Sequence, residues 1–218
     1  MSRPVVREPL RRNSRANRAR ILATARRELG RNPDVTLEEL ARAAGVVRRT
    51  LFGHFPGRAA LLEALAEEAS ETLRSAVAAC AERTQAQSAE RVLAHLMFSM
   101  WPAGDRYRLL LALAKRDLGA ERVAEVLAPA REAITAVLER GQQDGVFPAH
   151  LPAAVLSAGL EAMTVAVLEA VNTGALEDDG GTRVTIATLI AAGVSEERSR
   201  AVVGEVASDV AVEPPVGG

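Results

Sequence analysis

Residues 36–58 read TLEELARAAGVVRRTLFGHFPGR, and this stretch decides the fold of the N-terminal part of the chain. Its first apolar residues recur at the spacing of one face of a short helix: Leu37, Leu40, Ala41 and Ala44. Thr36 and Glu39 form a capping box, which sets the start of this helix. Gly45 ends it, because glycine accepts the left-handed conformation that a helix terminus requires.

A second short helix is predicted directly after this glycine. Its apolar positions are Val46, Leu51 and Phe55, and its outward positions are Arg48, Arg49, Thr50 and His54. Two short helices joined by a tight turn, with adjacent arginines on the second, are typical of a helix-turn-helix. Leu51 is expected to fill the gap between the helices, which cross closely at the small residue Ala41. The motif therefore predicts a protein that reads DNA.

The stretch ARAAGVVRRTLFGHFPGRAALLEAL resembles the DNA-binding signature of the tetracycline-repressor (TetR) family of regulators. The positions that carry the resemblance are Ile21, Leu22, Ala25, Thr36, Ala41, Gly45, Thr50, Phe52, His54, Phe55, Pro56, Arg58, Leu61 and Leu62. The resemblance implies an all-α fold of about nine to ten helices, with an N-terminal three-helix helix-turn-helix DNA-binding domain. It also implies a C-terminal helical bundle for ligand binding and dimerisation.

The sequence departs from the family pattern at four places. Val47 stands where a Ser or Thr usually caps the recognition helix, and the loss of such a cap costs about 1 kcal/mol. Phe52 replaces the more usual Tyr, and Gly53 is an unfavourable helix former within the recognition helix. The connection at residues 31–35 is shorter than usual. These departures leave the motif intact, but together they weaken any transfer of a relative's operator sequence to this chain.

The charge is divided along the sequence, although the net charge of the chain is only −1. Residues 1–62 hold fourteen Arg and five acidic residues, a net charge of +9, and the remainder holds 13 basic and 23 acidic residues, a net charge of −10. A basic block that contains a helix-turn-helix indicates a phosphate-binding surface. The alternative, an ordinary solvated surface, predicts that both signs are spread evenly.

The predicted organisation has four parts: a flexible basic arm (1–14), the helix-turn-helix domain (15–60), the ligand-binding and dimerisation domain (61–207) and a flexible tail (208–218). The first helix is expected from about Ala16 to Leu29. Pro102 is expected to end one helix, and Pro129 to separate two others, because proline cannot continue the hydrogen-bonding of a helix.

The expected location is the cytoplasm, or the nucleoid when the protein is bound to DNA. The single cysteine, Cys80, fits a reducing compartment, and no signal peptide is recognised. The most apolar stretch, residues 151–171, is interrupted by Glu161 and Glu169, which leaves no long uncharged run. We therefore predict a helix buried within protein, and no membrane partner.

Two arginines are the predicted readers of base sequence. Arg48 and Arg49 lie at the start of the recognition helix, the end that enters the major groove. Arginine forms two hydrogen bonds with O6 and N7 of guanine, so at least one of the pair is expected to read a base. The alternative is that both contact phosphates.

Other polar residues are predicted to contact the DNA backbone. The resemblance and their outward positions imply this role for Thr50, His54 and Arg58, which would fix the register on DNA without reading sequence. Thr36 is either a phosphate contact at a helix N-terminus or a purely structural cap. Arg15 and Arg18, together with Arg11 and Arg12, are expected to reach an adjacent groove as the arm orders on DNA.

The sequence contains no recognisable catalytic or metal-binding motif. No nucleophile elbow, paired-acid motif or glycine-rich phosphate loop is present. The histidines His54, His95 and His150 are scattered and share no ligand spacing with Cys80. We therefore expect no metal, no cofactor and no enzyme activity. The enzyme alternative predicts turnover that survives mutation of the arginines.

A ligand pocket is predicted in the C-terminal part, where Met and aromatic residues gather in a chain otherwise poor in aromatics: Met97, Phe98, Met100, Trp101 and Tyr107. Such side chains suit an adaptable apolar pocket, and the resemblance implies a ligand cavity among these helices. The predicted ligand contacts are Met97, Trp101, Tyr107, Glu161 and Met163, for a small apolar or amphipathic effector. The alternative is an ordinary core position for each, or a solvated carboxylate at Glu161.

Small residues predict a dimer interface. Alanines recur at every fourth position at Ala154, Ala158, Ala162, Ala166 and Ala170, and this ridge lets another helix approach closely. The helix expected at residues 182–192 is apolar nearly all round and includes Ile186 and Ile190. Together they look like half of the four-helix dimer interface that the resemblance implies.

The sequence therefore predicts a homodimeric transcriptional repressor that binds double-stranded, pseudo-palindromic operator DNA and is released by a small molecule. The alternative is a DNA-binding regulator with no small-molecule effector, which a tightly filled cavity would favour.

Overall fold

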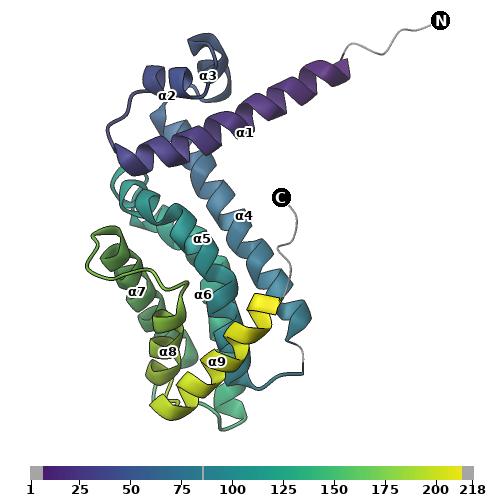
Figure 1. The fold of residues 1–218 in the computed structure, drawn as a ribbon, viewed down its shortest axis with the longest axis vertical. Coiled ribbons are helices and arrows are strands. Elements are labelled where there is room, and N and C mark those ends of the chain that lie inside the picture. Colours follow the sequence, from purple (N-terminus) through teal and green to yellow (C-terminus); the bar gives the residue numbers. More distant parts are fainter. Residues whose placement is uncertain (1–6, 85, 213–218) are drawn as a thin grey trace, which may run out of the picture. The chain divides into compact units, whose positions relative to one another are not determined.

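The computed structural model describes residues 7–84 and 86–212, and the regular secondary structure within them is entirely helical (Figure 1). The helices are α1 (Arg7–Arg31), α2 (Leu37–Ala43), α3 (Arg48–His54), α4 (Arg58–Arg83), α5 (Ala89–Asp117), α6 (Ala120–Gln143), α7 (Ala153–Asn172), α8 (Thr182–Ala191) and α9 (Glu196–Val212). The predicted all-α fold is confirmed.

The two helix ends that were predicted at prolines are wrong. α5 continues through Pro102, and α6 continues through Pro129. A proline removes only one backbone hydrogen bond from such a long helix. The neighbours of Pro102, Trp101 and Ala103, are both buried, so the packing of these residues keeps α5 continuous.

The first helix begins earlier than Ala16, because α1 starts at Arg7. Much of the arm predicted to be flexible is therefore helical, and residues 1–6 lie outside the described residues. Pro9 is tolerated because it lies in the first turn, where backbone N–H groups have no acceptor within the helix. At the other end, α9 extends to Val212 and takes in part of the predicted tail, whose last residues, 213–218, also lie outside the description.

The chain forms two compact units. The N-terminal unit holds the chain up to Ala69 together with Leu109–Glu125, and the bundle unit holds Ser70–Arg108 and the chain from Val126 onward. The helices α4, α5 and α6 contribute residues to both units. The helix-turn-helix thus shares a unit with the end of α5 and the start of α6, a segment that the expected domain boundary after residue 60 leaves out.

Each unit has its own buried apolar core. In the N-terminal unit the core formed by α1–α4 includes Ile21, Leu22, Ala25, Leu29, Leu40, Ala41, Ala44, Leu51, Phe55, Leu61, Leu62 and Leu65. In the bundle unit α8 packs against α7 and α9, and the largest fully buried side chains are Leu93, Leu138, Phe147, Leu160, Val184 and Leu189. These cores fix the helices that present the candidate functional residues.

The prediction that the apolar stretch at 151–171 is buried within the protein is wrong for the single chain. Among the described residues, α7 is the one helix that is long and apolar enough to cross a membrane by length and composition, and only 22% of its most apolar window is buried. Its inward side holds Leu156, Ser157 and Leu160, while the alanine side is exposed. Burial of this other side requires a partner that the single chain lacks.

Candidate nucleic-acid interface

The start of α2 is fixed by the predicted capping box. The Glu39 N–H donates to Thr36 Oγ1 at 3.2 Å, and Glu39 Oε2 accepts from the Thr36 N–H at 2.9 Å and from the Thr36 hydroxyl at 2.8 Å. The two hydrogen bonds that Glu39 Oε2 accepts hold the pKa of Glu39 below its usual value, and the bond from the Thr36 backbone has the larger effect. The capping box is confirmed, and in this structure both polar groups of Thr36 bond within the protein.

The turn between α2 and α3 has the geometry that the sequence predicts. Gly45 adopts a φ of +62°, in the left-handed region that favours glycine. The Val46 N–H donates back to the Ala41 carbonyl at 3.0 Å, which closes the turn. Leu51 is fully buried and Phe55 nearly so, so α3 is anchored through one face and exposes the other. This places the candidate recognition helix on the surface of the N-terminal unit.

The start of α3 has no side-chain cap. Val47 occupies the N-cap position, and its side chain is 69% exposed. A valine offers no oxygen to the first N–H groups of the helix, which are left to solvent or to an anion. The cap that the sequence lacks at Val47 is therefore also missing in the structure.

The two predicted base readers have different surroundings. Arg48 Nη2 lies 3.0 Å from Glu38 Oε1 of α2, and the Arg48 guanidinium stacks over the Phe52 ring at 5.0 Å from its centroid. Arg49 is exposed at the next position. Both arginines reach the surface at the start of α3, the end of a recognition helix that meets base edges.

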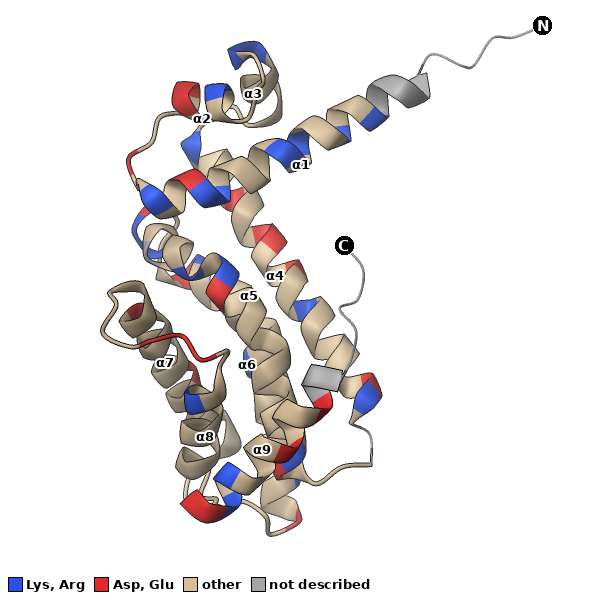
Figure 2. Cartoon of the chain, in the orientation of Figure 1, with Lys and Arg blue, Asp and Glu red and all other residues tan. Residues whose placement is uncertain are grey.

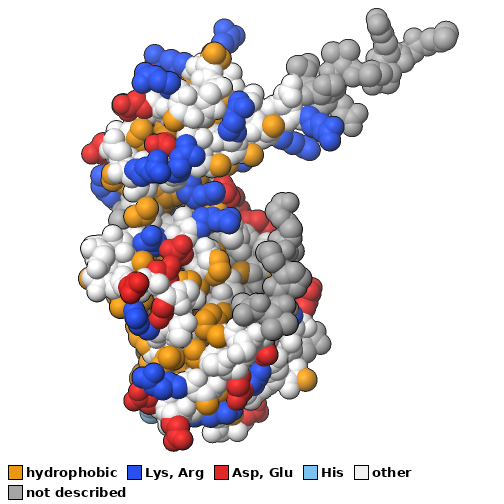
Figure 3. Space-filling model, in the orientation of Figure 1, with side chains coloured by type: hydrophobic (Ala, Val, Ile, Leu, Met, Phe, Trp, Pro, Cys, Tyr) orange, Lys and Arg blue, Asp and Glu red, His pale blue; other side chains and the backbone are white. Residues whose placement is uncertain are grey.

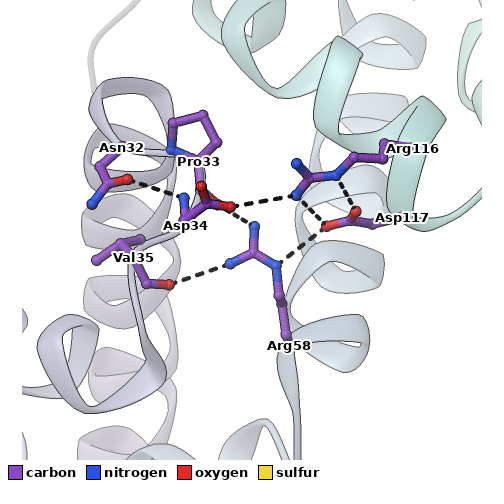
Figure 4. Close-up of polar contacts among 7 residues, drawn as sticks. All are labelled: Asn32, Pro33, Asp34, Val35, Arg58, Arg116 and Asp117. Carbon is purple, nitrogen blue, oxygen red and sulfur yellow. Dashed lines mark hydrogen bonds and ion pairs between the residues drawn. The ribbon is translucent and has the colours of Figure 1, made fainter.

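Only some of the residues predicted to contact the DNA backbone lie together in the structure. Thr50 and His54 lie half-buried on α3 and share its surface with the arginines. Arg58 opens α4, and its guanidinium donates to Pro33 O at 2.5 Å, Val35 O at 3.3 Å and Asp117 Oδ2 at 3.2 Å (Figure 4). All three of its guanidinium nitrogens thus bond within the N-terminal unit.

Arginines continue the packing face of α1. Arg15, Arg18, Leu22, Ala25 and Leu29 follow one another at spacings of three and four residues, so they share one face. The three apolar residues are buried and the two arginines are exposed. The Arg18 guanidinium lies over the Phe55 ring, 5.5 Å from its centroid, at the end of α3. Figure 2 marks basic positions along α1 and on α3, and Figure 3 shows basic side chains over this part of the molecule, so the N-terminal unit has a basic surface.

Three of the five residues predicted to contact a ligand, Met97, Trp101 and Met163, lie in or against the core of the bundle unit. Met97, Trp101 and Tyr107 are buried, and Met163 packs partly buried against the same core. The Trp101 indole N–H donates to Asp178 Oδ1 at 3.2 Å. These contacts give Trp101 a structural role in the chain as it stands.

Glu161 already has a cationic partner within the chain. Arg131 donates to its two oxygens from Nε at 2.8 Å and from Nη2 at 2.9 Å. This hydrogen bonding raises the pKa of the Arg131 guanidinium above its usual value. Any ligand at this position meets a paired carboxylate and guanidinium, and not an isolated carboxylate.

The predicted dimer residues form an exposed apolar surface on α7 and α8. Ala154, Ala158, Ala162 and Ala166 are exposed and Ala170 is half-buried; on α8, Ile190 is exposed and Ile186 is half-buried. Val155, which is 54% exposed, extends this surface. Small residues on this face leave the α7 backbone open to the close approach of another helix.

Sequence reasoning missed the contributions of Glu38, Arg116, Asp117 and Arg122. Glu38 pairs with Arg48. The other three join the end of α5 and the start of α6 to α4 and to the connection before α2. Their sequence neighbours do not reveal these contacts, because each of the four also has a partner on a different helix or connection.

Comparisons with known proteins place these features in context. Residues 21–65 match the family model for bacterial regulatory proteins of the tetR family. None of the curated proteins compared with the chain matches it.

Similar solved structures share the fold over most of the chain. The fatty acid degradation regulator FadR from Bacillus halodurans is 17% identical, with 81% of this chain and 98% of that chain covered and a TM-score of 0.67. The TetR-like regulator LfrR from Mycobacterium smegmatis, in complex with proflavine, is 23% identical, with coverages of 82% and 97% and a TM-score of 0.63. FadR from Bacillus subtilis, in complex with stearoyl-CoA, is 15% identical, with coverages of 81% and 99% and a TM-score of 0.65. At these identities the likeness is one of fold.

Proposed function

Through residues 21–65 the chain belongs to the tetR family of bacterial regulatory proteins, and we propose that it is a homodimeric transcriptional repressor released from its operator by a small molecule. The observation that carries the proposal is the pair Arg48 and Arg49, exposed at the start of an anchored recognition helix within a basic unit. Two such helices in a dimer would enter successive major grooves of a pseudo-palindromic operator. Such a regulator is located in the cytoplasm, where the operator DNA lies.

Base reading is assigned to the arginines of α3, and positioning to the residues around them. Arg49 is exposed and reads a base, and Arg48 does so once DNA displaces Glu38 from its guanidinium. Thr50 and His54 contact the backbone beside them. Arg15 and Arg18 extend the contact to phosphates along the flank of the site, because their face of α1 continues past α3. The capping box supports a structural role for Thr36.

Dimerisation is proposed through α7 and α8. The exposed alanine ridge of α7 and the exposed Ile190 of α8 form an apolar surface that water does not favour. A second copy offers the same surface in a two-fold arrangement, which gives a self-complementary interface. This pairing would bury the face of α7 that the single chain leaves open.

The effector is proposed to bind in the bundle unit. LfrR with proflavine and the FadR protein of Bacillus subtilis with stearoyl-CoA are complexes of proteins with this fold, and they support an apolar or amphipathic small molecule here. Met97 and Met163 suit such a ligand because methionine side chains adapt their shape. The effector can shift the DNA-binding equilibrium only by the difference in its affinity for the two states.

A regulator without a small-molecule effector is the second candidate. The observation in its favour is that Met97, Trp101 and Tyr107 are all buried, as in a filled core. Trp101 is the only tryptophan, so its fluorescence reports on this region alone. A true effector should change that fluorescence and release operator DNA over the same concentration range, because linkage makes the two effects reciprocal. A compound that changes the fluorescence and never shifts operator affinity would favour the second candidate.

The DNA-binding part of the proposal is tested by selection of bound sequences from random DNA. The wild-type protein should enrich a pseudo-palindrome. Arg49→Ala should weaken binding to it by about 1–3 kcal/mol and relax the preference at one position in each half-site. Arg200→Ala, which removes an exposed arginine from α9, is the matched control and should leave both unchanged. A loss for Arg49→Ala that is equal on all sequences would demote Arg49 to a phosphate contact.

A further inference from the structure

The turn between α5 and α6 is built into the N-terminal unit. Leu110 and Leu113, near the end of α5, are buried there. Gly30, near the end of α1, lies so close to Leu109 that a Cβ at this glycine would come 2.8 Å from Leu109 Cδ1. The absence of a side chain at Gly30 therefore lets the ends of α1 and α5 pack directly together.

Arg58 joins two segments that are far apart in the sequence. Its Nη2 and Nη1 donate to the carbonyls of Pro33 and Val35, in the connection between α1 and α2. Its Nε donates to the carboxylate of Asp117, at the last residue of α5 (Figure 4). The two carbonyls lie within the three residues before Thr36, the cap of α2, so Arg58 binds the connection next to the start of the helix-turn-helix.

Asp117 is held as a charged acceptor at this position. Arg116 donates to it from Nε at 2.7 Å, and Arg58 approaches its other oxygen. The hydrogen bond from Arg116 is the largest cause of its lowered pKa, and that from Arg58 acts in the same direction. Arg116 also lies 4.0 Å from Asp34, in the same connection (Figure 4). Asp117 therefore stays ionised at neutral pH and can keep Arg58 in place.

A second set of ion pairs fixes the start of α6 to α4. Arg122 pairs with Glu63 and lies 3.5 Å from Glu67. Both acids follow Arg58 along α4. The α5–α6 turn is thus held on one side by the connection before α2 and on the other by α4.

We propose that Arg58 is a positioning residue that ties the α5–α6 turn to the connection before α2, and that it does not contact the DNA backbone. The proposal rests on the proposed DNA-binding function and revises the role expected for Arg58 from the sequence. Because α5 and α6 both continue into the bundle unit, a shift of their ends on effector binding would move Asp117, and through Arg58 the connection that sets α2 and α3.

Only an arginine fits this position. Its guanidinium presents donors in several fixed directions, which suits three acceptors on two segments. A lysine keeps the charge but concentrates its donors on one nitrogen, so it cannot reach all three oxygens at once. Arg58→Lys therefore separates positioning from charge.

The test is the affinity for the selected operator, measured over a series of salt concentrations. Asp117→Asn removes a negative charge, which on electrostatic grounds alone would strengthen DNA binding. We expect instead a loss of about tenfold, because the tie is weakened. Arg58→Gln should also bind the operator about tenfold more weakly, while the slope of log affinity against log salt concentration stays unchanged. The double variant should bind the operator as tightly as Arg58→Gln alone. Asp144→Asn, which removes an exposed acid after α6, is the control and should bind as wild type.

The opposite results overturn the proposal. If Arg58 contacts a phosphate, Arg58→Gln lowers the salt slope by about one unit, and the losses of the two single variants add. Should Arg58→Gln fail to fold, Arg58→Lys replaces it: we expect weaker binding with an unchanged slope, and wild-type affinity would overturn the proposal. If the wild-type chain enriches no DNA sequence, the proposed function itself fails, which is a separate outcome.

Discussion

Arg48 Nη2 lies 3.0 Å from Glu38 Oε1, so the first arginine of the recognition helix is held against α2 in the DNA-free protein. The side chains of Arg48 and Glu38 are 70% and 46% exposed, and an exposed ion pair of this kind contributes about 0–1 kcal/mol to stability. DNA can therefore displace Glu38 at little cost. The carboxylate instead places a negative charge beside the phosphates that the unit binds.

Glu38→Gln should therefore strengthen operator binding. Removal of the carboxylate frees Arg48 and lessens repulsion of the phosphates, and the gain should be greatest at low salt. The gain is measured as the affinity of the variant for the operator at two salt concentrations. Glu197→Gln on α9 is the control for a general change in charge. A loss of base preference in the variant would mean that Glu38 orients Arg48 for reading.

A cap restored at residue 47 should stabilise the start of α3. Val47 is exposed and forms no side-chain cap, so Val47→Thr sacrifices little burial and adds an oxygen for the first N–H groups. The expected gain is about 1 kcal/mol. Amide hydrogen exchange in α3 should slow, whereas Val155→Thr on α7 should leave it unchanged. Faster exchange in α3 would show that Val47 packs in a way that its exposure does not reveal.

The pKa of Asp117 predicts how acid affects the N-terminal unit. Its pKa is lowered in the folded protein, chiefly by the hydrogen bond from Arg116. A lowered pKa contributes stability that is fully present above the unfolded value of 3.8 and is lost as the pH falls through the folded value. The stability difference between wild type and Asp117→Asn should therefore shrink as the pH falls below that value. A difference that stays constant with pH would show that the Asp117 charge does not stabilise the fold.

The dimer interface is tested by a charge placed in the alanine ridge. Ala162 is exposed in the single chain, so Ala162→Arg should leave the fold intact and bury an unpaired charge only if two α7 helices meet. Sedimentation should then report monomers that bind half-sites weakly. Ala201→Arg, at an exposed alanine of α9, should remain dimeric. An unchanged dimer for Ala162→Arg would place the interface elsewhere.

The sequence predicts those features that depend on near neighbours. The capping box pairs Thr36 with Glu39, and the turn depends on Gly45. Both features depend on residues within a few positions of each other, and both are confirmed. The continuity of α5 through Pro102 was missed because buried neighbours outweigh the lost hydrogen bond.

Partners far apart in the sequence could not be predicted. Arg58 and Asp117 are 59 residues apart, and the folding of two connections brings them together. The spacing rules that found the recognition helix describe one helix at a time. The family resemblance and the outward position that assign Arg58 to the DNA backbone do not reveal its partners on other segments either. The pairing of Arg131 with Glu161 escaped notice for the same reason.

The central claim is that the basic N-terminal unit binds DNA in a sequence-specific way. The most direct measurement is the affinity of the wild-type chain for its selected operator and for random DNA, between about 50 and 200 mM salt. The net charge of +9 on residues 1–62 predicts that operator affinity falls about a thousandfold or more over this range, as neutralised phosphates regain their counterions. Operator DNA should remain preferred over random DNA throughout. An operator affinity that barely changes with salt, or that equals the affinity for random DNA, would contradict the claim.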